Sequence, residues 1–74
     1  MPYTNRIVVN PEIMLGKPVI KGTRITVELI VRCLSEGMSI EELLEAYPHL
    51  TREDIMASLS YSADVLSKQT LIEP

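Results

Sequence analysis

The stretch that decides the fold is Gly16-Lys17-Pro18-Val19-Ile20-Lys21-Gly22-Thr23-Arg24-Ile25. Two short runs rich in β-branched residues, 18–20 and 23–25, flank Lys21-Gly22, and glycine takes a positive φ angle at no steric cost. The stretch therefore predicts a tight hairpin or a sharp extended bend. Because an isolated hairpin is marginal in water, we expect the β-branched run at residues 6–9 to join it, within the chain or across a dimer.

Two helices are predicted next along the chain. The first has Thr26 as its N-cap and ends at Gly37, which suits a left-handed C-terminal cap. The second starts at Ser39, where Glu42 completes a capping box, and Pro48 stops it. Apolar residues recur at helical spacing in both, as Val27, Ile30, Val31 and Leu34 and then as Ile40, Leu43, Leu44 and Tyr47.

A third helix is predicted after Thr51, with Asp54 in a similar capping role. Its expected buried face consists of Ile55, Leu59, Ala63 and Leu66. The tail at residues 68–74 is short, and we expect it to fray unless Leu71 and Ile72 dock onto the domain.

The order of these elements predicts a mainly α fold. A short strand and basic β-hairpin (residues 6–25) precede a three-helix unit (26–67) and the tail (68–74), all within one domain, 1–74. Three helices, with a three-residue turn at 37–39 between the first two, have the layout of a trihelical helix-turn-helix, with the third helix in the recognition position.

The small size of the chain predicts association. A domain of 74 residues buries only about 60% of the surface that its unfolded chain exposes. A core of this size stabilises a fold only weakly, and the single cysteine, Cys33, cannot close an internal disulfide. We therefore expect the chain to gain stability by forming a homodimer or a hetero-complex. The lone cysteine favours a reducing cytoplasm, and apolar runs of three residues are far too short to span a membrane.

Charge is divided unevenly along the chain, whose net charge is −3. Residues 1–36 carry a balance of +2 and residues 37–74 a balance of −5. Such a bipolar chain suits a protein that offers one end to an acidic partner and the other to a basic one, although it also serves solubility alone.

The run at 16–25, followed by Val27, Gly37-Met38-Ser39 and Tyr47-Pro48, resembles the bacterial and archaeal family known as domain of unknown function 433. The likeness covers residues 6–63. It implies a homeodomain-like helix-turn-helix fold and a role as antitoxin of a type II pair whose toxin is a PIN-like ribonuclease. Such antitoxins neutralise the toxin directly and often repress their own operon as DNA-bound dimers. The motif positions are Gly16, Lys17, Pro18, Ile20, Gly22, Thr23 and Arg24.

The basic residues of the N-terminal half are the candidate DNA contacts. Lys17, Lys21 and Arg24, held by glycines, suit phosphate contacts, although the glycines and the proline also suffice simply to shape a hairpin. The spacing excludes a phosphate-cradling P-loop. The third helix opens with acidic residues and lacks the side chains that read bases. We therefore expect Arg32 to complete the DNA contacts, with Arg52 as an auxiliary.

No other constellation predicts chemistry. Glu41, Glu42 and Glu45 form an acidic helix face that is typical of solvated surfaces, with a basic partner or a metal as the alternative. His49 lies in a loop without a paired nucleophile, and Cys33 is expected as a small buried apolar residue. We therefore predict no enzyme activity, no metal and no cofactor.

Three functions remain open at the level of the sequence. The first is an antitoxin that binds a PIN-like toxin and, as a dimer, its own promoter. The second is a stand-alone helix-turn-helix regulator of transcription. The third is a dimerisation module that binds neither, for which Met56, Ser60 and Tyr61 are candidate contact residues on the third helix.

Overall fold

A two-stranded antiparallel sheet opens the fold. In the computed structural model, which describes residues 3 and 5–69, β1 (Ile7–Val8) pairs with β2 (Val19–Ile20). Ile7 lies opposite Ile20 and Val8 opposite Val19. The expected addition of the first strand is therefore confirmed, and it occurs within the chain. The loop between the strands contains a short 3₁₀ turn, η1 (Met14–Gly16).

The predicted hairpin at 18–25 is present as a tight turn with a very short second arm. The Thr23 N–H donates to the Ile20 carbonyl at 2.9 Å, and Gly22 inside the turn has a φ of 79°. Beyond the turn, a single bridge joins Val19 to Thr26, and the Ile20 N–H donates to the Ile25 carbonyl. The chain then passes directly into the first helix.

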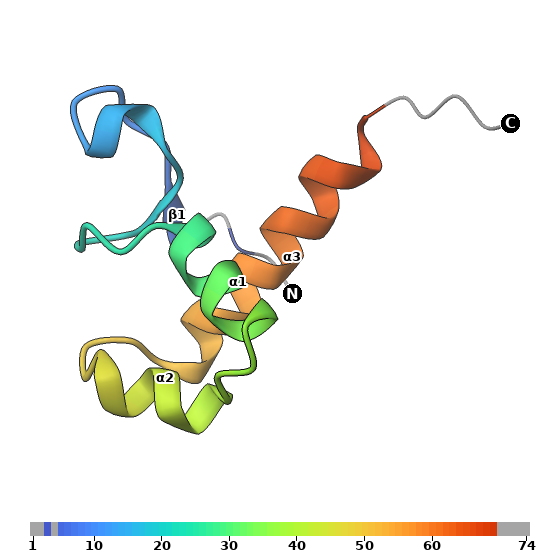
Figure 1. Cartoon of the computed structure of the whole chain (residues 1–74). Coiled ribbons are helices and arrows are strands. Elements are labelled where there is room, and N and C mark those ends of the chain that lie inside the picture. Colours follow the sequence, from blue (N-terminus) through green and yellow to red (C-terminus); the bar gives the residue numbers. More distant parts are fainter. Residues whose placement is uncertain (1–2, 4, 70–74) are drawn as a thin grey trace, which may run out of the picture.

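The three predicted helices are all present, as α1 (Val27–Ser35), α2 (Ile40–Ala46) and α3 (Arg52–Ser67) (Figure 1). Their predicted N-caps Thr26, Ser39 and Thr51 each accept a hydrogen bond from a backbone N–H of the first turn. Both predicted capping boxes form, at Ser39 with Glu42 and at Thr51 with Asp54. The layout confirms a mainly helical fold preceded by a small antiparallel sheet.

A single apolar core joins the sheet to the helices. Ile30, Leu43 and Ile55, one from each helix, are completely buried at its centre. The sheet contributes Ile7 and Ile20 from one side. The core lies against the N-terminal half of α3, so the C-terminal half of this helix extends past the body of the domain (Figure 1).

The predicted buried face of the third helix is wrong beyond its first turn. Ile55 is buried, but Leu59, Ala63 and Leu66 are exposed. The core instead receives Ala57 and Ser58, and the Ser58 hydroxyl is satisfied by donating to the Asp54 carbonyl at 3.0 Å. Helical spacing alone does not reveal where a helix leaves the domain that it packs on.

Tyr3 contacts the projecting part of α3. The ring of Tyr3 meets the ring of Tyr61 edge-on, with centroids 5.3 Å apart, and its hydroxyl donates to Asp64 at 2.9 Å. This hydrogen bond raises the pKa of Tyr3 above its usual value. The expected docking of Leu71 and Ile72 concerns residues outside those that the structure describes.

Candidate functional site

Two of the residues predicted to contact DNA, Lys17 and Arg32, form ion pairs with the same carboxylate, that of Glu28. Lys17 Nζ lies 3.0 Å from Glu28 Oε1, and Arg32 lies 3.1 Å from Glu28 Oε2. Hydrogen bonds from Lys17 and then Arg32 hold the pKa of Glu28 below its usual value. The three side chains together keep one net positive charge, so this corner of α1 is less basic than the sequence predicted.

Lys21 and Arg24 are placed differently, on the exposed turn between β2 and α1. Among the ion pairs of the described residues, neither takes part. The turn that carries them is rigid, because the Thr23 hydroxyl donates to the Ile20 carbonyl and accepts from the Ile25 N–H. These two cations remain available to a phosphate or a carboxylate.

Most of the quoted motif has a structural role. Gly16 and Gly22 have positive φ angles, the Pro18 carbonyl accepts from the Val27 N–H at 2.9 Å, and Ile20 is a core residue. Thr23 fastens the turn. Lys17 is paired with Glu28, so Lys21 and Arg24 are the two charged motif positions for which the described residues supply neither a core contact nor an ion pair.

The surface formed by α2 and the first turn of α3 is acidic. Arg52, the predicted auxiliary DNA contact, is bound to Glu41 at 2.8 Å, and the hydrogen bond from Arg52 lowers the pKa of this carboxyl. Four exposed carboxylates occupy this surface, namely Glu41, Glu42, Glu45 and Glu53. In a helix-turn-helix protein this surface faces DNA, and here it would repel phosphates.

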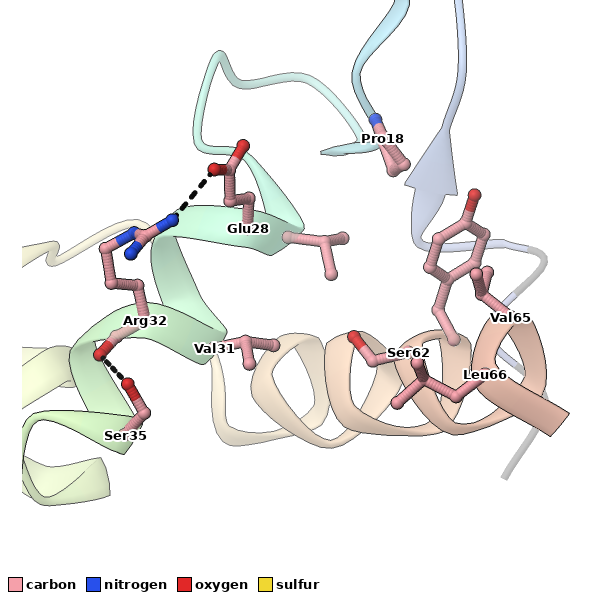
Figure 2. A pocket seen from close by; sticks show the side chains of 10 residues that line it. Pro18, Glu28, Val31, Arg32, Ser35, Ser62, Val65 and Leu66 are labelled. Carbon is pink, nitrogen blue, oxygen red and sulfur yellow. Dashed lines mark hydrogen bonds and ion pairs between the residues drawn. The ribbon is translucent and has the colours of Figure 1, made fainter. Parts of the chain in front are cut away.

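An apolar groove lies on another face of the domain, between α1 and the projecting half of α3 (Figure 2). It has a volume of about 460 Å³. Val27 and Val31 line it from α1, and Tyr61, Val65 and Leu66 line it from α3. Glu28 and Arg32 stand on the rim, joined by their ion pair (Figure 2).

Helical spacing places Leu66 in the core and therefore does not predict this groove. One signal was available, since Asp64 is the only charged residue between positions 55 and 67. A solvated helix face normally carries several charges. Of the contact residues proposed from the sequence, Tyr61 lines the groove, whereas Met56 and Ser60 do not.

Other candidate groups remain separate. Cys33 is half-buried beside the core, and His49 is exposed in the loop before α3. Among residues 3 and 5–69, no group of three or more His, Cys, Asp or Glu side chains is arranged to hold a metal ion. None of the helices in this described part is long and apolar enough to cross a membrane.

Comparison with known proteins gives consistent matches. A family model described as a protein of unknown function, DUF433, matches residues 7–62. The uncharacterized protein y4eO of Sinorhizobium fredii (strain NBRC 101917 / NGR234) is 38% identical over 53 residues, which are 72% of this chain and 24% of the relative. The crystal structure of a DUF433 member protein from Anabaena variabilis matches with a TM-score of 0.81 at 34% identity, over 86% of this chain and 63% of that one. The chain thus spans about a quarter of the length of y4eO.

Proposed function

Because the chain belongs to the DUF433 family, whose function is unknown, we propose its role from its own surfaces. It is the antitoxin of a type II toxin–antitoxin pair, a non-catalytic cytoplasmic homodimer that neutralises a PIN-like ribonuclease by binding it directly. The resemblance of the motif at 16–25 to antitoxin-like proteins supports this role.

The observation that carries the proposal is the acidic surface of α2 and the start of α3. A ribonuclease holds a polyanionic substrate, so its RNA-binding surface has to be cationic. The exposed carboxylates of Glu45 and Glu53, which no cation of the described residues pairs with, are complementary to such a surface. An antitoxin that occupies it with carboxylates excludes RNA by direct competition.

Co-expression with a PIN-like ribonuclease encoded next to this chain tests the proposal. The native chain should restore growth and co-purify with the ribonuclease, and its association rate should fall as salt rises. The double variant Glu45→Gln/Glu53→Gln should bind more slowly, because it keeps the size of both side chains and removes two charges. Glu12→Gln, on the exposed loop after β1, is the matched control. The absence of both rescue and complex would refute the antitoxin role.

A second candidate function is promoter binding, which Lys21 and Arg24 favour. Both side chains lie on one rigid exposed turn, away from the acidic surface. In this arrangement a dimer would contact phosphates through its two turns, and the third helix would not enter the major groove. The test is a mobility shift on the DNA upstream of the gene.

A further inference from the structure

The apolar groove and the C-terminal half of α3 are two parts of one surface. We name residues 59–67 the arm; it carries Leu59, Val65 and Leu66, which are among the exposed large apolar side chains of the chain. Leu66 has 62% of its surface exposed. Val65 and Leu66 also line the groove, so the arm is at once a projecting apolar element and the side of an apolar depression (Figure 2).

We propose that the groove is occupied by the arm of a second copy of this chain, in a symmetric dimer. In such an isologous interface each copy offers the same surface patch, so the arm and the groove have to belong to one continuous patch. The arm meets this condition, because it is part of the groove and projects beyond the body that it packs on (Figure 1). The inference rests on the homodimer of the proposed function and not on the toxin.

Charge complementarity favours a second copy. Glu28 and Arg32 line the rim of the groove, and Lys17 lies beside them on the same carboxylate, so this cluster of three side chains is net positive. The arm carries one charged residue, Asp64, which is negative. Asp64 accepts from Tyr3 and lies outside the groove lining, so docking places a negatively charged arm beside the net positive cluster of the partner and puts no charge of the arm at the apolar centre.

The dimer interface has to extend beyond the groove, over the rest of the arm and the neighbouring face of α1. A stable interface takes about 800 Å² from each partner, which is about 15% of the accessible surface of 5308 Å². The interface needs only one side of the domain, formed by α1 and α3. The acidic surface of α2 and the turn with Lys21 and Arg24 lie outside the groove lining and stay free for other partners.

Sedimentation equilibrium of the full chain measures the dimer directly. Leu66→Glu should raise the dimer dissociation constant by roughly 30-fold or more, the change expected when an interface hot spot is lost. Leu15→Glu is the matched control, since Leu15 is 93% exposed but lies in η1, outside the groove lining. Val65→Ser provides a milder second variant if the first alters the melting curve.

Cross-linking then locates the contact. In a Cys33→Ser background, chains with Val31→Cys are mixed with chains carrying Leu66→Cys, and we expect a disulfide between the two kinds of chain. Mixing with Leu15→Cys chains should give none. A chain that is monomeric at all concentrations, or a dimer that Leu15→Glu breaks and Leu66→Glu does not, would overturn the inference.

Growth rescue by the Leu66→Glu variant separates this inference from the proposed function. A monomeric variant that still neutralises the toxin supports the interface and removes the dimer from the neutralising role. If instead the native chain is monomeric and Leu66→Glu abolishes toxin binding, the groove receives the toxin and the inference is wrong. If the native chain is a dimer and Leu66→Glu abolishes both dimerisation and toxin binding, the interface is supported and neutralisation requires the dimer.

Discussion

The guanidinium of Arg6 lies 3.1 Å from the carboxylate of Asp54 and ties the residue before β1 to the first turn of α3. The side chain of Asp54 is only 10% exposed. Its second oxygen accepts from the Thr51 N–H at 3.0 Å and so closes the capping box of α3. One carboxylate therefore both starts a helix and holds the sheet against it.

Replacing Arg6 with leucine should lower the free energy of unfolding by about 1–2 kcal/mol, the range for an acceptor left partly unsatisfied in a buried position. The nearly buried carboxylate of Asp54 would keep its cap but lose its counter-charge. Urea unfolding followed by circular dichroism measures this change. Arg52→Leu is the control, because its ion pair with Glu41 is exposed and should contribute very little. Equal losses in the two variants would contradict the prediction.

The local signals of the sequence were sufficient for the helices. Thr26, Ser39 and Thr51 were predicted as N-caps, and each is one, because a cap depends on residues within three positions of it. Gly37 was likewise predicted to end the first helix, and it lies just beyond α1 with a φ of 99°. The expected pairing of the strand at residues 6–9 with the hairpin is also present, as β1 against β2. An isolated hairpin is only marginally stable in water, which is why a further strand was expected to join it.

The surfaces were less predictable, because they depend on contacts between distant residues. Leu59 and Leu66 have helical spacing with Ile55, yet α3 is longer than the body that it packs on, so they are exposed. Lys17 and Arg32 are predicted DNA contacts, and in the structure both pair with Glu28. The pairing of Glu28 with Arg32 follows from their i,i+4 spacing on one helix, whereas the approach of Lys17 and the groove depend on how α1 packs and could not be derived from spacing.

Replacing Gly22 with alanine should lower the free energy of unfolding by about 1–2 kcal/mol, the cost of a left-handed conformation in a residue with a side chain. No atom lies within 4 Å of the position that a Cβ would take, so the cost is purely conformational. Gly22→Asn should recover part of the loss, because asparagine tolerates this conformation better. The measurement is again urea unfolding, and a stabilised Gly22→Ala variant would show that the turn is not held at its φ of 79°.

The pKa of Glu28 should rise toward its usual value in the Lys17→Met variant, because the hydrogen bond from Lys17 is the largest cause of its lowering. A lowered pKa means that the ion pair stabilises the fold above the unfolded pKa and that this contribution disappears as pH falls through the folded pKa. The variant should therefore lose less stability on acidification than the native chain. Carboxyl chemical shifts followed by NMR between neutral and acidic pH report the pKa. An unchanged pKa of Glu28 would contradict the prediction. The pKa of Glu41, which is lowered by Arg52, should stay the same in the variant and is the internal control.

Replacing both Lys21 and Arg24 with alanine should abolish most of the affinity for promoter DNA. Both cations are exposed and take part in none of the ion pairs found among the described residues, so under the proposed promoter binding they would contact phosphates without first breaking an ion pair. Each lost phosphate contact should reduce the slope of log affinity against log salt by about 0.9. Mobility shifts at several salt concentrations measure that slope.

Lys17→Ala is the control, because this side chain is held by Glu28 and its replacement should change the slope far less. If Lys17→Ala and the double variant reduce the slope equally, or if the native chain fails to bind at low salt, the turn is not the DNA contact.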